Sequence, residues 1–124
     1  MAFPVEAIPD ADRLLHHVAE PMFIRAEGRP SSACFKKKPK LSVNWEKYSS
    51  VEHTRRERSF AVVSLQAATC RYELQQQVIH SPLQGGEQFG PNQAHADIEG
   101  DKPQQIADRM ARAAIVEWTR EQDA

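Results

Sequence analysis

Two histidines, His80 and His95, lie on either side of a segment rich in glycine and proline, residues 82–92. Each belongs to a short stretch that is typical of a β-strand, so pairing of the two strands as a hairpin would bring the imidazoles close together. Two imidazoles can cleave RNA without a metal, because one takes the 2′-hydroxyl proton while the other protonates the leaving oxygen. Asp97 lies two residues beyond His95 on the same strand face and could orient that ring. This pattern is compatible with a small metal-independent ribonuclease.

The same residues have a structural interpretation, in which His95 hydrogen-bonds a carboxylate on a sheet surface and has no other role. No two histidines have the i, i+4 spacing of a zinc-binding helix, and neither cysteine has a Cys-x-x-Cys partner. The glycines of the 82–92 segment are not followed by the Lys-Ser or Lys-Thr pair of a nucleotide-binding loop. We therefore expect neither a metal nor a cofactor.

Charge is distributed unevenly along the chain. Ten basic and four acidic residues between Arg25 and Arg58 give that stretch a net charge of +6, which leaves −7 for the rest of a chain whose total is −1. Such asymmetry can mark a surface for nucleic acid or for an acidic protein, and a solvated, solubilising loop is the other interpretation. The candidate binding residues are Arg29, Lys36, Lys37, Lys38, Lys40, Arg55 and Arg56.

Length and composition favour one small globular domain. The chain has 124 residues, of which 27% are charged and 40% hydrophobic. No apolar run has the ~18–20 residues of a membrane-spanning helix. The first ten residues lack the basic and apolar regions of a signal peptide, and two cysteines make no disulfide framework. These features predict a cytoplasmic protein that does not bind membranes.

The pattern of apolar residues predicts an N-terminal arm over residues 1–9, followed by one α+β domain over residues 10–124. In that domain we expect a small mixed β-sheet with a C-terminal helix packed on it. The expected strands cover residues 22–25, 41–45, 60–65, 77–80 and 93–98, and the expected helices cover 10–19, 49–58, 67–75 and 103–121. The segment 67–76 would connect two parallel strands. The expected core comprises Val62, Val63, Ile79 and Ile98, covered by Met110, Ile115 and Trp118.

Several short motifs resemble a loose family of small bacterial proteins without a known function. They are Leu14-Leu15-His16, Phe23, Gly28, Ser31-Ser32-x-x-Phe35, Leu41-Ser42-Val43, His80-Ser81-Pro82 and Asn92-x-Ala94-His95-Ala96. The resemblance covers roughly residues 13–115. It implies a bacterial, one-domain protein and implies no substrate, cofactor or catalytic residue.

The sequence therefore favours a non-catalytic accessory or adaptor subunit of a bacterial complex, with a protein as the expected partner and nucleic acid as a second candidate ligand. Two alternatives stay open. One is the ribonuclease that uses His80 and His95. The other is an immunity or antitoxin-type inhibitor, which the split charge would also suit.

Overall fold

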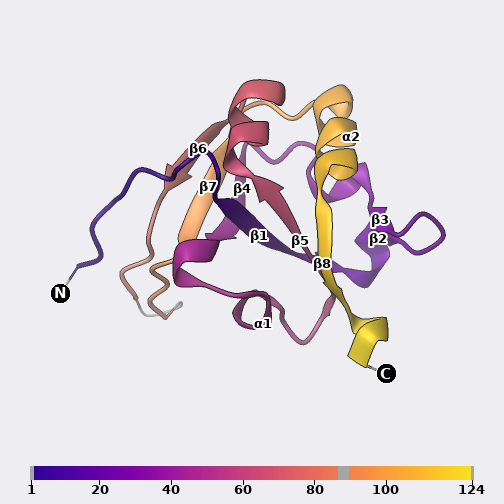
Figure 1. Ribbon diagram of the computed structural model, residues 1–124, viewed down its shortest axis with the longest axis horizontal. Coiled ribbons are helices and arrows are strands. Elements are labelled where there is room, and N and C mark those ends of the chain that lie inside the picture. Colours follow the sequence, from indigo (N-terminus) through magenta and orange to yellow (C-terminus); the bar gives the residue numbers. More distant parts are fainter. Residues whose placement is uncertain (1, 87–89, 124) are drawn as a thin grey trace.

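One six-stranded antiparallel sheet organises the molecule, as the computed structural model in Figure 1 shows. Its strands are β1 (Arg13–Ala19), β4 (Lys40–Trp45), β5 (Ser59–Gln66), β6 (Gln77–His80), β7 (His95–Glu99) and β8 (Ile115–Thr119). They lie in the order β6-β7-β4-β1-β5-β8, and every neighbouring pair is antiparallel. A separate two-stranded sheet pairs β2 (Phe23–Ile24) with β3 (Arg29–Pro30).

The structure describes residues 2–86 and 90–123. Met1 of the expected arm, residues 87–89 of the expected loop and Ala124 lie outside the described residues. The α-helices are α1 (Val51–Thr54) and α2 (Gln104–Ala113). Short 3₁₀ turns cover Glu20–Met22, Ser32–Cys34, Glu46–Tyr48 and Arg120–Asp123, and a π-helical turn covers Thr69–Glu73. Among the described residues, no helix has the length and apolar character needed to cross a membrane.

The main core lies between one face of the sheet and helix α2. Side chains alternate across a strand, so Leu41, Val43 and Trp45 of β4 point to the same side. They pack with Met110 and the buried alanines of α2 in one apolar cluster. The opposite face carries a smaller cluster of Leu15, Val62 and Trp118, against which Val51 of α1 packs. Between these elements the second face is polar, and this exposes the candidate site described below.

The prediction of an α+β protein with a C-terminal helix packed on a sheet is confirmed. The strands expected over residues 41–45, 60–65 and 77–80 are present, and the strand expected over 93–98 runs from His95 to Glu99. The expected strand over 22–25 is reduced to two residues, and the expected helix over 49–58 is reduced to α1. Ser50 caps α1, because its side chain accepts a hydrogen bond from the backbone N–H of His53.

The connection expected between residues 60–65 and 77–80 joins two strands that run in the same direction, because four antiparallel pairings separate β5 from β6. The two strands are not neighbours, since β6 pairs with β7 and three strands lie between β6 and β5. The segment between β5 and β6 contains the π-helical turn and leads to β6 at one edge of the sheet.

The helix expected over residues 10–19 is wrong, because Arg13–Ala19 forms strand β1. The apolar residues Leu14, Leu15 and Val18 fit one edge of a helix, and they fit equally a strand that is buried on both faces. β1 pairs with β5 along its whole length and with β4 at one end. Tertiary pairing therefore decides its structure.

The expected helix over residues 103–121 is correct only in its first half. It ends at Ala113, and Ala114 adopts an extended conformation that leads directly into β8. The β-branched pair Ile115-Val116 favours a strand. Consequently Trp118 lies on β8 and not on the helix, and it packs on the face of the sheet opposite to Met110.

Most of the predicted core is buried. Val62, Val63, Ile98 and Met110 are fully buried, and Trp118 is 8% exposed. Two expected core residues are misplaced, because Ile79 is 37% exposed on an edge strand and Ile115 is 62% exposed at the start of β8. Edge strands have one fewer neighbour to cover their side chains, and this accounts for both errors.

Candidate functional site

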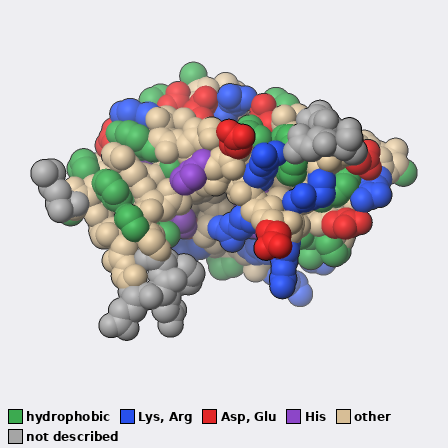
Figure 2. Space-filling model, turned by 90° about the horizontal axis from the view of Figure 1, so that it is seen from below, with side chains coloured by type: hydrophobic (Ala, Val, Ile, Leu, Met, Phe, Trp, Pro, Cys, Tyr) green, Lys and Arg blue, Asp and Glu red, His purple; other side chains and the backbone are tan. Residues whose placement is uncertain are grey.

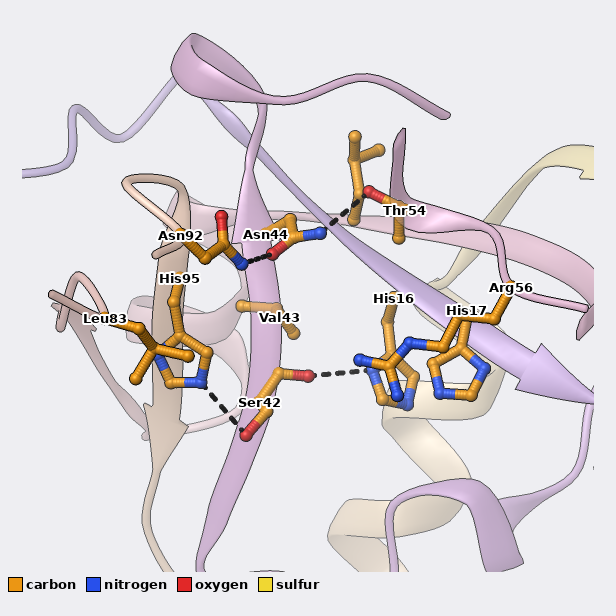
Figure 3. Close-up of a pocket in the computed structure, with 11 residues that line it drawn as sticks. His16, His17, Ser42, Val43, Asn44, Thr54, Arg56, Leu83, Asn92 and His95 are labelled. Atoms are coloured by element: carbon orange, nitrogen blue, oxygen red, sulfur yellow. Dashed lines mark hydrogen bonds between the residues drawn. The ribbon is translucent and has the colours of Figure 1, made fainter. Parts of the chain in front are cut away.

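The candidate site opens where strands β1 and β4 separate. These strands pair at only two positions, Leu14 with Trp45 and Leu15 with Asn44. Beyond them the strands diverge, and the ring of His16 fills part of the gap by donating its Nδ1–H to the carbonyl oxygen of Ser42 at 2.9 Å. Figure 3 shows the two strands moving apart beside this contact. The divergence leaves a hollow in an otherwise continuous sheet.

A cavity of about 90 Å³ occupies this hollow, and its wall is polar and apolar in equal parts. Its volume suits a few water molecules or one small group of a ligand. The residues that line it come from β1, β4, residues 54–56, the bridge between Leu83 and Asn92, and the start of β7: Leu15, His16, His17, Ser42, Val43, Asn44, Thr54, Arg56, Leu83, Asn92 and His95. None of these described lining residues is acidic.

His95 is held by hydrogen bonds to both of its ring nitrogens. A carbonyl oxygen can only accept, so the 2.9 Å contact between Nδ1 and the backbone oxygen of Ser81 places the proton of the neutral ring on Nδ1. Nε2 is then an acceptor, 3.3 Å from the hydroxyl oxygen of Ser42. The Ser81 hydroxyl lies 3.0 Å from Nδ1 and donates to Asp97 Oδ2 at 2.7 Å. Asp97 is thus connected to His95 through Ser81.

Asn44 and Asn92 form a hydrogen-bonded polar wall on the same face of the sheet as His95. The side-chain amide of Asn92 donates to the Asn44 side-chain oxygen at 2.9 Å, and the amide of Asn44 donates to the Thr54 hydroxyl at 3.1 Å. The side-chain oxygen of Asn92 accepts the backbone N–H of Ala94 at 3.1 Å. This chain of bonds joins Asn92 to β4 and, through Thr54, to α1.

Positive charge lies on the other side of Ser42. Burial lowers the pKa of His16 to about 4, against the opposing effect of its bond to Ser42, and the charges of His17, Lys38 and Arg56 lower it further. Burial also lowers the pKa of His17, followed by the charges of Arg56 and Lys38. Both histidines are therefore neutral near pH 7, and Arg56 supplies a permanent charge to the cavity. Figure 2 shows histidine side chains beside a group of Lys and Arg side chains on this side of the molecule.

The structure does not bring His80 and His95 together. The strands do pair as a hairpin, but His80 lies opposite Ala96, so His95 points to the other face of the sheet. His80 is 2% exposed and packs against the rings of Trp45 and Tyr48. Its Nε2–H donates to the carbonyl oxygen of Gln93 at 2.7 Å, and Nδ1 accepts the Glu6 backbone N–H at 2.9 Å. The expected proximity of the two imidazoles is wrong, and His80 is a buried structural residue.

The basic residues singled out from the sequence are dispersed among several environments. Arg29, Lys40 and Arg55 form ion pairs with Glu27, Glu99 and Glu52, and Lys38 donates to the Cys34 carbonyl oxygen. Lys37 lies beside Pro39, Asp101 and Pro103 at a separate hollow, and Lys36 is half-buried. Of these residues, Arg56 lines the cavity and Lys38 lies close enough to influence its histidines.

Within the part of the chain that the structure describes, no group of three or more His, Cys, Asp or Glu side chains could hold a metal ion. Comparison of the chain with protein-family models, with curated proteins and with solved structures found no match. The resemblance to small bacterial proteins therefore stays a prediction, and the site is interpreted from its own geometry.

Several residues of this cavity are absent from the candidates that the sequence predicts. The alternation that correctly places Leu41, Val43 and Trp45 on one face also places Ser42 and Asn44 on the other, which is the face of His95. This alternation is sufficient to place Ser42, Asn44 and His95 together once the pairing of β4 with β7 is known. His16 and His17 had no comparable signal, because their segment was expected to be a helix.

Proposed function

We propose that the protein is an accessory or adaptor domain, one that binds a larger partner by accepting an anionic group of that partner in the cavity between β1 and β4. The observation that carries this proposal is the composition of the cavity wall. It combines the guanidinium of Arg56 with the polar side chains of Asn44, Asn92 and Thr54, and no described lining residue is acidic. Guanidinium groups recognise carboxylates and phosphates through paired hydrogen bonds.

Positive charges near the two histidines support an anionic ligand. Burial is the main cause of the lowered pKa of His17, and the charges of Arg56 and Lys38 lower it further. An anion bound there would relieve the repulsion among these groups and favour protonation of His17. Binding should therefore strengthen as the pH falls through the range in which His17 gains its proton.

The chemistry of the cavity suits a phosphate of nucleic acid and a carboxylate of an acidic protein alike. The proposed adaptor role in a bacterial, cytoplasmic complex rests on the composition and the resemblance described above. The overall charge of −1 and the ion-paired state of Arg29, Lys40 and Arg55 favour a localised contact over a long electrostatic surface. We therefore expect binding that depends on Arg56 and Lys38 more than on the other basic residues.

Reversal of the Arg56 charge tests the proposal. We expect Arg56→Glu to weaken binding of a labelled single-stranded RNA, or of a labelled acidic peptide, by at least about tenfold at low salt. Fluorescence anisotropy titrations over a range of salt concentrations measure this change. For RNA, loss of one phosphate contact should also reduce the dependence of log K on log salt by about one unit.

Arg109→Glu is the matched control, because Arg109 is an exposed residue of α2 and its substitution changes the net charge equally. It should leave binding nearly unchanged. The ligand whose binding separates the two variants identifies the class of partner, nucleic acid or acidic protein. Equal weakening by both variants would show that only net charge matters, and the proposed site would then be wrong.

A further inference from the structure

We propose that Ser42 and His95 act as a nucleophile and a general base toward small carboxylic esters whose acyl group carries a negative charge. This activity goes beyond the proposed binding function, and it rests on that function only for the position of the substrate's charge. The two side chains project from neighbouring strands, β4 and β7, onto the same polar face. Ser42 is exposed and His95 is half-buried, so a substrate can reach both.

His95 has the tautomer that a general base requires. Its Nδ1–H is directed to the carbonyl oxygen of Ser81, which leaves the lone pair of Nε2 facing the Ser42 hydroxyl 3.3 Å away. A serine hydroxyl is a weak nucleophile until a base takes its proton, and an oriented histidine is the usual partner. Contacts of this kind are often long in the absence of a substrate and shorten when one binds.

Ser81 and Asp97 are positioning residues for this base. The Ser81 hydroxyl lies between Nδ1 of His95 and Oδ2 of Asp97, at 3.0 and 2.7 Å. When His95 gains a proton its ring becomes a cation, and a carboxylate one hydrogen bond away stabilises that cation. The same contacts prevent rotation of the ring away from Ser42. Ser42, His95 and Asp97 therefore have the roles of nucleophile, base and orienting carboxylate, and all three lie on or beside strands of the antiparallel sheet.

Arg56 sets the chemical class of the substrate. Figure 3 shows Arg56 and His95 on opposite sides of Ser42. An acyl group bound with its carbonyl carbon at Ser42 and its leaving oxygen toward His95 would therefore extend toward Arg56. A carboxylate on that acyl group could pair with the guanidinium. The cavity volume of about 90 Å³ limits the acyl group to a few carbon atoms.

The reaction proceeds in two balanced steps. In the first, Ser42 Oγ bonds to the ester carbonyl carbon, its proton passes to Nε2 of His95, and the same proton is transferred to the departing alcohol as the ester C–O bond breaks. In the second, a water molecule gives its proton to His95 and its oxygen bonds to the acyl carbon. The bond to Ser42 then breaks, Oγ recovers the proton, and a carboxylic acid is released.

Hydrolysis of two chromogenic esters by the purified protein tests the inference. The p-nitrophenyl ester of acetic acid lacks a charge on the acyl group, whereas the mono-p-nitrophenyl ester of succinic acid carries one. We expect kcat/KM to be larger for the succinate, and Arg56→Gln to remove about tenfold of that preference. Ser42→Ala should reduce hydrolysis to the rate of free imidazole, and His95→Gln should reduce kcat about 10²–10⁴-fold.

Mass spectrometry of the acylated protein separates this chemistry from non-specific reaction at surface side chains. The succinyl group should be found on Ser42, and Ser31→Ala, which removes a serine hydroxyl outside the cavity, should leave the rate unchanged. Ser81→Ala should lower kcat with little change in KM, as expected for a residue that positions the base. Acyl transfer that persists in Ser42→Ala, or a label found on lysine or histidine instead of Ser42, would overturn the inference.

These experiments distinguish failure of the catalytic inference from failure of the binding proposal. Ser42→Ala keeps Arg56 and the asparagine wall, so it should bind the anionic partner as well as the unmodified protein does. Normal binding without ester hydrolysis would refute only the catalytic inference. Loss of binding in Arg56→Glu, together with ester hydrolysis that requires Ser42 and His95, would support both proposals.

Discussion

The ring of His16 joins β1 to β4 where the strands no longer pair. This ring is enclosed between Phe35 and His17, with ring centroids 6.0 and 5.6 Å away, and it donates to the Ser42 carbonyl oxygen. Burial is the main reason that its pKa falls to about 4, and the nearby charges of His17, Lys38 and Arg56 act in the same direction. The folded protein therefore keeps this ring neutral in mildly acidic solution.

This lowered pKa predicts a specific loss of stability in acid. The unfolded chain protonates His16 near its ordinary pKa of 6.5, whereas the folded protein does so near 4. Between these values the unfolded state holds the extra proton, so the free energy of unfolding falls as the pH falls through this window. The contribution of His16 amounts to about 2 kcal/mol between about pH 7.5 and about pH 5.

Urea denaturation at the two pH values measures this contribution. His16→Gln keeps a donor for the Ser42 carbonyl and does not titrate, so the stability of this variant should depend less on pH. His53→Gln is the control, because His53 is exposed on α1. An unchanged pH dependence in His16→Gln would contradict the assignment of this effect to His16.

At the scale of elements, strand β8 closes one edge of the sheet and carries Trp118. The indole packs on Leu15 and Val62, and the guanidinium carbons of Arg55 and Arg120 lie 4.8 and 5.7 Å from its ring centroid. Arg120 also donates to the carbonyl oxygens of Ser59 and Glu57, at 2.9 and 2.8 Å. β8 and the turn after it therefore hold residues 55–57 against β5, through Trp118 and Arg120.

Replacement of Trp118 tests the importance of this second core. Trp118→Ala removes a buried aromatic ring and leaves a cavity, and we expect the free energy of unfolding to fall by about 3 kcal/mol. Ile115→Ala, on the same strand, changes a side chain that is 62% exposed and should have little effect. Thermal or urea denaturation compares the two variants. Equal losses would show that Trp118 does not stabilise the domain by burial.

The elements whose sequence pattern fits only one type of secondary structure were predictable. Strand β5 is β-branched and apolar on both faces, and β4 and β7 alternate clearly, so their presence and orientation follow from the sequence. β1 was not predictable, because consecutive leucines followed by two histidines fit a helix edge and a buried strand alike. The end of α2 was signalled by Ile115-Val116, but the alanine-rich sequence before it favours a longer helix.

The candidate site was only partly predictable for a related reason. His95, Asp97 and Arg56 were identified by residue type, and Ser42 and Asn44 were implied by alternation. Their assembly depends on strand order, which places β4 between β1 and β7 although these strands are distant in the sequence. The error about His80 came from the register, since a shift of one residue moves a side chain to the opposite face.

At the scale of the whole molecule, the N-terminal segment crosses the sheet and is held at several points. The Glu6 carboxylate pairs with Lys47 Nζ at 2.7 Å and accepts a hydrogen bond from Tyr48, and these two contacts lower its pKa. The Glu6 backbone N–H donates to Nδ1 of His80, and Ile8 is buried in the main core. His80 of β6 therefore connects the N-terminal segment to Gln93, which precedes β7.

Hydrogen exchange at the Glu6 amide tests this connection. His80→Phe keeps an aromatic ring against Trp45 and Tyr48 but removes the acceptor for the Glu6 N–H, so exchange at this amide should become at least about tenfold faster. The Asp12 amide donates to the Pro9 carbonyl oxygen, independently of His80, and serves as the internal reference. Unchanged exchange at Glu6 would mean that the segment is held without His80.

The two-position pairing of β1 with β4 has a consequence for how the chain folds. This short contact divides the sheet into one half formed by β6, β7 and β4 and another formed by β1, β5 and β8, and the chain passes repeatedly between the halves. Neither half is a continuous piece of sequence, so neither can complete its hydrogen bonding before the other. The molecule should consequently unfold in one cooperative transition and fold slowly for its size, because almost every strand pair must close a long loop.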